Sequence, residues 1–288
     1  MRNLNFELKR LCDRNRDGSY ATQRDRRRSL DLMANQLTDM GFGQMSAISL
    51  KPKHVTALIA RWKLEHRSIG TIKNRLADLR WWAEKIGKQN VVAKDNAHYR
   101  IADRQYVTNV SKARQLTEGD VSRVTDPYTR ISLQLQAEFG LRRGESIKMQ
   151  PQWADRGDKL VLMATWTKGG REREIPIRTE AQRRVLDEAK RLAGKHSLIP
   201  PEKTYVEQLR RFEYQCAKAG IHGVHGHRHQ YAETRYRELT GWAAPAAGGP
   251  RSHELTSAQK EIDHEARLTI SRELGHDREA IVSVYIGR

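Results

Sequence analysis

Three imidazoles and one guanidinium lie within five residues of this 288-residue sequence, in the segment His225–His229 (His-Gly-His-Arg-His). In a helix, His225 would share a face with Arg228 and with His229, because residues three and four positions apart lie on the same side. Such a face suits one phosphate group held by donors from one side.

The same cluster, together with His222, has a second interpretation as a zinc site, because imidazole is a common zinc ligand. That reading would make the protein a metal-dependent nuclease. No matching set of cysteines or carboxylates accompanies the histidines, so no metal and no cofactor is expected. At least one of His222 and His227 is expected to be purely structural.

Two more guanidinium groups stand in Gly140–Glu145 (Gly-Leu-Arg-Arg-Gly-Glu), at the end of a predicted helix. The rigid fork of an arginine suits phosphate, and the carboxylate of Glu145, three residues after Arg142, can hold that fork in position. Taken alone, the pattern is also typical of a surface ion pair.

Each of three further side chains, considered alone, could have either a catalytic or a structural role. Lys168 lies in a glycine-flanked turn, where an ammonium can face a leaving oxygen or simply be solvated. His276 follows Gly275, which is typical of a helix end. Tyr285 lies in the apolar run 281–286, where a tyrosine usually belongs to a core or an interface.

The elements that must position these residues are mainly helical. Ile131, Leu135 and Phe139 form a helical stripe that runs to Gly140. The remaining pattern predicts strands at Lys159–Met163 and Glu174–Ile177 joined by a turn at Lys168–Arg171, helices at 180–193, 205–219 and 265–274, and a loop at 241–250. The fold class is therefore mainly α with a small β-hairpin (α+β).

The first part of the chain is predicted to be all helical. Apolar residues recur at helical spacing over 30–40, 55–62 and 72–82, and Ser68 is a candidate cap for the last of these helices. Lys73 and Arg80, seven positions apart, lie on one side of that helix. The candidate DNA contacts are Arg26, Arg27, Arg28, Lys73 and Arg80. Periodicity is lost after residue 88, which predicts domains at 1–88 and 115–288 and a linker at 89–114.

Charge points to a polyanionic partner. Lys and Arg (53) exceed Asp and Glu (35), a net charge of +18. Residues 1–112 contribute +12 of it, with 23 basic against 11 acidic side chains. Nucleic acid is the expected partner, and an anionic membrane surface is the weaker alternative. No apolar run is long enough to span a membrane, and no signal peptide is expected. The chain has two cysteines, Cys12 and Cys216, which suits a reducing cytoplasm.

In order, these residues resemble the tyrosine recombinase (phage integrase) family, whose pattern is Arg, Lys, His-x-x-Arg, His or Trp, then Tyr. The pattern falls here on Arg142, Lys168, His225, Arg228, His276 and Tyr285. The resemblance spans about 115–285, and residues 68–86 are similar to the helical core-binding domain that precedes the catalytic domain. Phe139 replaces the usual Thr, the segment between Arg228 and His276 is longer than usual, and only three residues follow Tyr285.

The resemblance implies a site-specific DNA recombinase that integrates or excises a mobile element. Tyr285 would attack a phosphodiester and form a 3′-phosphotyrosyl link, with Arg142 and Arg228 clamping the phosphate. Lys168 would protonate the leaving 5′ oxygen, and the other imidazoles would donate to the phosphate (His225, His276). Glu145 and His229 would support these groups without touching DNA.

The resemblance also implies partners: a double-stranded attachment site, a homotetramer on two duplexes, and DNA-bending or directionality factors, without a membrane. A resolvase or inversion enzyme would use identical chemistry, so the residues do not separate it from an integrase. A DNA-binding protein that has lost activity would carry the same basic charge. All six expected catalytic side chains are nevertheless present.

Overall fold

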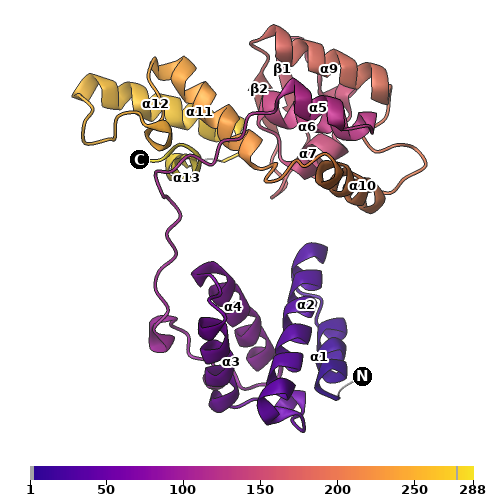
Figure 1. Cartoon of the computed structure of the whole chain (residues 1–288), viewed down its shortest axis with the longest axis vertical. Coiled ribbons are helices and arrows are strands. Elements are labelled where there is room, and N and C mark those ends of the chain that lie inside the picture. The colour runs from indigo at the N-terminus through magenta and orange to yellow at the C-terminus, as the bar shows by residue number, and fades with distance from the viewer. Residues whose placement is uncertain (1–2, 277) are drawn as a thin grey trace. The chain divides into compact units, whose positions relative to one another are not determined.

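The computed structural model describes residues 3–276 and 278–288, and the chain divides into two compact units, Met1–Gln105 and Tyr106–Arg288 (Figure 1). Helices dominate both units, and the strands form one small sheet, as the sequence predicted. Among the described residues, no helix is both long enough and apolar enough to cross a membrane.

The first unit is built from helices whose starts follow local sequence signals. Ser19 caps α2 and Ser68 caps α4, each accepting a backbone N–H in the first turn at 3.2 Å. Pro52 opens α3, where its missing N–H is not needed. The α-helices of this unit are α1 (Asn3–Arg14), α2 (Tyr20–Leu37), α3 (Pro52–Leu64) and α4 (Ile69–Lys85).

The predicted apolar stripes of these helices meet in one core. It includes Leu30, Met33, Leu37, Val55, Leu58, Ile59, Trp62, Ile72, Leu76 and Leu79. Both Trp81 and Trp82 are buried there. Each indole N–H has a partner, Asp17 for Trp81 and the Ala47 carbonyl for Trp82, so neither ring leaves a buried donor unsatisfied.

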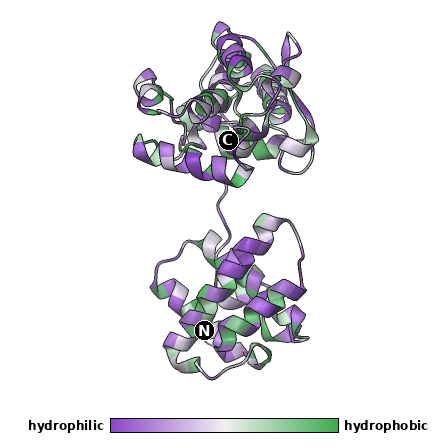
Figure 2. Ribbon diagram, turned by 90° about the vertical axis from the view of Figure 1, so that its right-hand side faces the viewer, coloured by the Kyte–Doolittle hydropathy of each residue, from purple (hydrophilic) through white to green (hydrophobic). Residues whose placement is uncertain are grey.

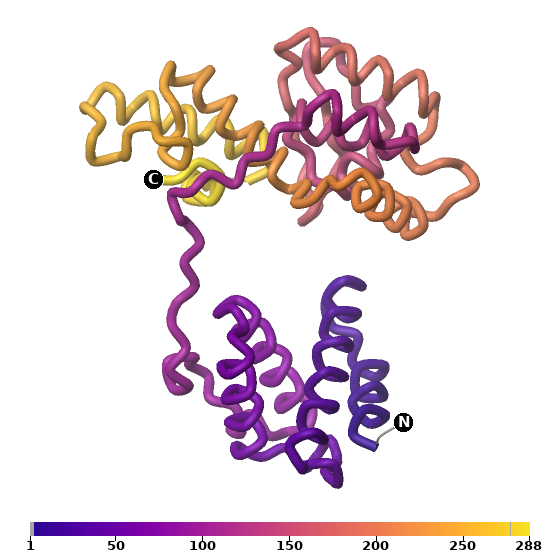
Figure 3. Tube along the Cα trace, viewed as in Figure 1, coloured from indigo at the N-terminus to yellow at the C-terminus, as the bar shows by residue number. Residues whose placement is uncertain are grey.

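Residues 89–105, which the sequence assigned to a linker, are part of the first unit. Two short 3₁₀ turns, η3 (Gln89–Val91) and η4 (Ala97–Tyr99), form there, and Val92 and Ile101 are buried in the core. These two apolar residues are too far apart to produce a periodic signal. From Ile101 to Thr117 the chain has no helix or strand (Figure 3).

The second unit carries the residues that resemble the recombinase pattern. Its helices are α5 (Glu118–Arg123), α6 (Pro127–Phe139), α7 (Arg143–Lys148), α8 (Pro151–Ala154), α9 (Glu180–Ala193), α10 (Tyr205–Lys218), α11 (Gly226–Thr240), α12 (Ser257–Glu273) and α13 (Glu279–Ile286). Helix α12 begins eight residues before the predicted 265, because Thr256 and Gln259 form a capping box. The loop predicted at 241–250 contains a 3₁₀ turn, η6 (Pro245–Ala247).

The sheet of this unit is one antiparallel pair, β1 (Lys159–Leu162) and β2 (Arg173–Pro176), in register Lys159 to Pro176. The connection is longer than the predicted four-residue turn, because a 3₁₀ turn, η5 (Ala164–Trp166), follows β1. Arg173 and Ile175 are buried and Glu174 is exposed, so the strand alternates between two faces.

One large core and a smaller one stabilise the second unit. Helix α6 packs against α7, α9 and α11, and its Ile131, Leu135 and Phe139 lie in the large core with Tyr285 of α13. The smaller core joins α6 and α7 to α10 through Leu133, Ile147 and Phe212. Hydrophobic and hydrophilic residues are interleaved along the helices of both units (Figure 2), as amphipathic helices require.

Candidate active site

A pocket of about 880 Å³ in the second unit collects most of the chemistry-bearing residues. Its walls come from the start of α7, the loop before β2, the starts of α10 and α11, and the segment from Gly275 into α13. The lining residues are Arg142, Arg143, Gly144, Lys168, Gly169, Arg171, Tyr205, His225, Gly275, His276, Arg278, Ile281 and Tyr285.

A sharp turn at Gly140 places the side chain of Arg142 at the wall of this pocket. Gly140 ends α6 in the left-handed conformation, with φ of +60°. A Cβ at this position would lie 2.6 Å from Cδ1 of Tyr231, so both the backbone angle and the packing require glycine. Arg142 then stands directly before α7, where its backbone N–H donates to Glu145 at 2.7 Å.

A buried carboxylate holds two guanidinium groups at the wall of the pocket. Glu145 accepts from Arg142 Nη1 at 2.7 Å and from both terminal nitrogens of Arg173 at 2.9 and 2.7 Å. Burial alone would raise the pKa of Glu145, but the hydrogen bond and charge of Arg173, and then the charge of Arg142, lower it to about 2. The site is thus held by a permanently ionised carboxylate.

Arg173 is a residue that the sequence interpretation missed. It is 6% exposed and lies on the inward face of β2 beside Ile175. The period-two alternation of the strand was a usable signal, because it places residues 173 and 175 on one face. An arginine on the inward face of a strand needs a buried partner, and here that partner is Glu145.

Arg228 and Tyr285 touch in the interior of the unit. Nε of Arg228 donates to the phenol oxygen of Tyr285 at 3.2 Å, and its terminal nitrogens donate to the carbonyls of Gly140 and Leu274. Arg228 is 1% exposed and Tyr285 is 7% exposed. Burial lowers the pKa of Arg228 to about 10, so the side chain is still a cation at neutral pH.

Three imidazoles surround the Tyr285 ring, with centroids 4.9 Å (His229), 6.0 Å (His225) and 6.3 Å (His276) away. Desolvation in the pocket, with the charges of nearby cations, lowers the pKa of His225 and of His276 to about 4. Both rings are therefore neutral at pH 7. His276 Nε2 accepts from Arg142 at 3.2 Å, and His229 Nδ1 donates to the Tyr285 carbonyl at 3.4 Å.

Lys168 lies at the exposed end of the loop between β1 and β2 and lines the pocket. Thr167 stabilises the base of this loop, because its hydroxyl donates to the Arg171 carbonyl at 2.7 Å and accepts from the Arg171 N–H at 3.0 Å. Gly169 and Gly170 follow with positive φ, which side-chain-bearing residues rarely adopt. Lys168 therefore reaches the pocket from a short glycine loop.

Comparison with known proteins identifies the family. A family model described as the N-terminal part of phage integrase matches residues 1–92, and an integrase model matches residues 91–234, half of the chain. The chain belongs to the phage integrase family of tyrosine recombinases. The second match ends before His276 and Tyr285, so it does not cover these two residues.

Solved integrase structures share the fold at low sequence identity. A lambda integrase dimer on a COC′ core site is 15% identical, with a TM-score of 0.65 over 98% of this chain and 76% of that one. The Tn1549 transposon integrase with circular intermediate DNA is 13% identical, with a TM-score of 0.56 over 100% of this chain and 96% of that one. No curated protein sequence matches the chain.

Two other histidines of the cluster, His222 and His227, do not line the pocket of this integrase. His227 Nδ1 donates to the Arg114 carbonyl at 2.8 Å, and His222 is exposed. Across residues 3–276 and 278–288, no three His, Cys, Asp or Glu side chains are grouped as metal ligands would be. His227 thus has the structural role that the sequence expected of at least one of these two residues.

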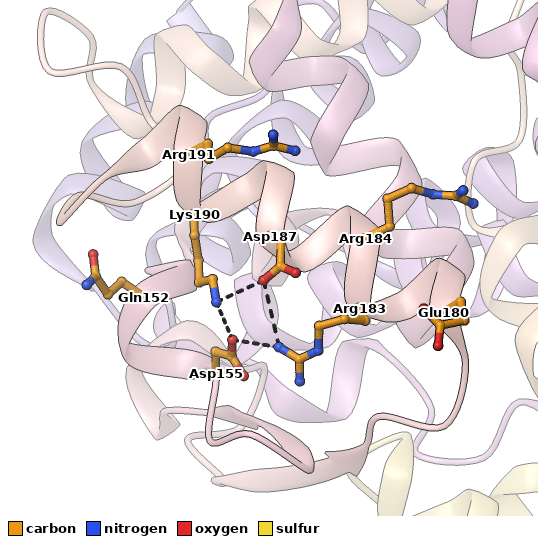
Figure 4. Close-up of a pocket in the computed structure, with 8 residues that line it drawn as sticks. All are labelled: Gln152, Asp155, Glu180, Arg183, Arg184, Asp187, Lys190 and Arg191. Carbon is orange, nitrogen blue, oxygen red and sulfur yellow. Dashed lines mark hydrogen bonds and ion pairs between the residues drawn. The ribbon is translucent and has the colours of Figure 1, made fainter.

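A second hollow of the integrase, of about 840 Å³, lies over α9 and the segment after α8 (Figure 4). Asp155 at its floor accepts from Arg183 at 2.8 Å and from Lys190 at 2.6 Å, and Asp187 pairs with both cations. These charges neutralise one another and attach α9 to the segment before β1. None of the predicted catalytic residues lines this hollow.

The candidate DNA contacts of the first unit differ in whether their side chains already have partners within that unit. Arg26 lies over the Trp81 ring at 4.4 Å, and Arg80 donates to the Ala93 carbonyl and the Asn96 side chain, so both stabilise their own unit. Lys73 pairs with Asp103 and Arg27 with Asp13. Arg28 is exposed.

Proposed function

We propose that this recombinase cleaves and rejoins double-stranded DNA through a covalent link between Tyr285 and a 3′-phosphate. The observation that carries the proposal is the 3.2 Å hydrogen bond from Arg228 Nε to the Tyr285 phenol, beside a pocket that also receives Arg142, His225 and His276. A phosphodiester in this pocket would meet the phenol as nucleophile.

Phosphoryl transfer places negative charge on the two non-bridging oxygens of the attacked phosphate. Arg142 and Arg228 would stabilise that charge, since fixed guanidinium forks bind phosphate oxygens in a defined geometry. Arg228 retains donors for this role, because each terminal nitrogen carries two hydrogens and each binds one carbonyl. Glu145 and Arg173 would keep Arg142 in place.

The proton balance assigns the remaining roles. The bond from the Tyr285 oxygen to phosphorus forms as the bond from phosphorus to the 5′ oxygen breaks. Neutral His225 would accept the phenol proton, and Lys168 would give a proton to the departing 5′ oxygen. His276 would donate to the phosphate. The bond energy is stored in the phosphotyrosyl link, so rejoining needs only attack by a 5′ hydroxyl.

The biological reaction that we propose is integration or excision of a mobile element. Two of the similar solved proteins are lambda integrase and a transposon integrase bound to DNA, and lambda integrase also forms a tetramer on a Holliday junction. For this chain we accordingly propose a double-stranded attachment site, four protomers on two duplexes, and action on bacterial DNA in the cytoplasm. DNA-bending and directionality factors would be its accessory partners.

The decisive experiment uses nicked suicide duplexes taken from the DNA that flanks the gene of this protein. The nick releases a short fragment after cleavage, so the protein stays covalently attached. The unchanged protein and the control Tyr214→Phe, at an exposed tyrosine, should form the adduct. Tyr285→Phe should bind the duplex and form none. A covalent band from Tyr285→Phe would rule out this nucleophile.

The same assay in EDTA separates the proposal from a metal-dependent nuclease that uses the segment His222–His229. A recombinase of this mechanism should form the same amount of adduct with the chelator present. Cleavage that requires a divalent ion and leaves no protein on the DNA would replace the proposal with the nuclease.

A further inference from the structure

A buried ion pair lies behind the helix that carries Tyr285. Arg267 of α12 is 3% exposed, and its Nε donates to both carboxylate oxygens of Asp263 at 2.8 and 2.9 Å. Asp263 also accepts from the Tyr236 hydroxyl of α11. Neither Arg267 nor Asp263 lines the active-site pocket. The pair joins α11 to α12 and belongs to no step of the reaction.

Arg267 continues from this pair to both sides of the nucleophile. Its Nη1 donates to the Ser283 hydroxyl at 3.3 Å and to the Gly287 carbonyl at 2.9 Å. Ser283 precedes Tyr285 by two residues, and Gly287 follows it by two. One guanidinium thus spans the segment of α13 that bears the phenol.

The segment after Tyr285 is also enclosed by two distant parts of the chain. Gly287 has φ of +80°, and a Cβ there would lie 2.7 Å from the Ala246 nitrogen and 2.8 Å from Asn109 Oδ1. The Arg288 N–H donates to the same Asn109 oxygen at 2.8 Å. The loop at 241–250, which makes the segment between Arg228 and His276 unusually long, therefore packs against the end of α13.

We propose that Arg267 is a positioning residue for Tyr285: it fixes α13 on its own catalytic unit so that the phenol meets Arg228. The inference rests on the proposed nucleophile. Apolar side chains could fill the same space, and replacing a buried ion pair with them is often neutral for stability. Directed hydrogen bonds restrict the rotation and register of a short helix more tightly than apolar packing alone, and α13 has eight residues.

The test compares variants that keep the buried charge balanced. The double variant Asp263→Asn with Arg267→Met removes both partners of the pair. Arg267→Lys keeps the charge on one nitrogen, which cannot replace both the Nε bonds to Asp263 and the Nη1 bonds to α13. Ser283→Ala removes one acceptor and no charge. Lys260→Met, at an exposed position of the same helix, is the matched control. Each is measured as the full chain.

Two readouts separate positioning from general stability. The first is the rate of adduct formation on the suicide duplex at saturating concentration, alongside the affinity for that duplex. The second is amide hydrogen exchange of residues 279–288 without DNA. We expect the double variant to keep its affinity and thermal midpoint, to exchange faster in this segment, and to form adduct about 10²-fold more slowly, since a misplacement of about 1 Å has that effect. Arg267→Lys and Ser283→Ala should be intermediate.

Unchanged exchange or an unchanged adduct rate in the double variant would overturn the inference, as would an equal loss of affinity and rate. If the double variant does not fold, the same two measurements on Arg267→Lys and Ser283→Ala test the inference. If the unchanged protein forms no adduct, the proposed function fails, while the exchange contrast still shows whether Arg267 holds α13.

Discussion

At the scale of single residues, the proposed active site contains a cation that stays charged while buried. Arg228 is almost completely buried, and burial lowers its pKa only to about 10. Two backbone carbonyls and the Tyr285 phenol accept its hydrogen bonds, which offsets the loss of water. The charge is therefore in place before any phosphate arrives, and preorganised charge is what speeds phosphoryl transfer.

Arg228→Lys tests this role with little loss of volume. A lysine keeps the charge but loses the fork that serves the carbonyls and the phosphate. We expect adduct formation on the suicide duplex to fall by about 10²- to 10³-fold while affinity changes little. Arg237→Lys, at an exposed position of the same helix, should have no effect. A parallel fall in affinity would make Arg228 a docking contact.

The pocket histidines predict a dependence of stability on pH. Burial lowers the pKa of His225 and of His276 from 6.5 to about 4, helped by His229 and Arg228 at His225 and by Arg142 and Arg228 at His276. The unfolded chain therefore binds more protons than the folded one between these values, so the free energy of unfolding falls as pH drops from about 6.5 to 4. Thermal midpoints at pH 7, 6 and 5 should decline, and His276→Asn should flatten the decline. His253→Asn, in an exposed loop, should not.

At the scale of elements, the junction of α6 and α7 decides where Arg142 points. Gly140 has φ of +60° and nearly touches the Tyr231 ring. Gly241 ends α11 in the same left-handed region, with φ of +85°, but a Cβ there would meet nothing within 4 Å. The two glycines thus separate the effect of the backbone angle from that of close packing.

Gly241→Ala should lower the free energy of unfolding by about 1–2 kcal/mol, the cost of the left-handed angle. Gly140→Ala should lower it by roughly 1–3 kcal/mol more, because the new methyl group overpacks against Tyr231. Chemical denaturation of both variants measures the difference. Equal losses would mean that the Tyr231 ring moves aside without strain.

At the scale of the whole molecule, two units with separate cores carry unequal charge. The cores share no residue, since one is built from residues 4–101 and the others from residues between 116 and 286. Residues 1–105, the first unit, carry +11 of the net charge of +18, with 22 basic against 11 acidic side chains. Part of that charge is used internally, as the contacts of Arg26 and Arg80 show.

Affinity for the flanking duplex should therefore depend strongly on salt. Neutralising phosphates releases condensed counterions, and six such contacts would weaken binding by about 10³-fold between 50 and 200 mM salt. A plot of log affinity against log salt concentration measures the number of contacts. Arg28→Ala should reduce the slope more than Arg80→Ala, because the donors of Arg80 are occupied within the unit. A flat response would refute the electrostatic argument.

The sequence by itself determined the helical class and the ends of many elements, because these follow from local signals, and its resemblance to a known family supplied the candidate reaction. The Ser68 cap, the Gly140 break and the apolar stripes all depend on residues a few positions apart. The ordered pattern from Arg142 to Tyr285 likewise needed no geometry to be noticed.

Only the tertiary structure decided which charges meet across long separations. The Glu145–Arg173 pair joins residues 28 positions apart, and Arg228 meets Tyr285 across 57. Strand alternation could place Arg173 on an inward face but could not name its partner, and nothing local distinguishes Arg267 from the many surface arginines of this basic chain. Burial gives them their roles, because a guanidinium removed from water must find partners, and only the folded backbone determines which partners are within reach.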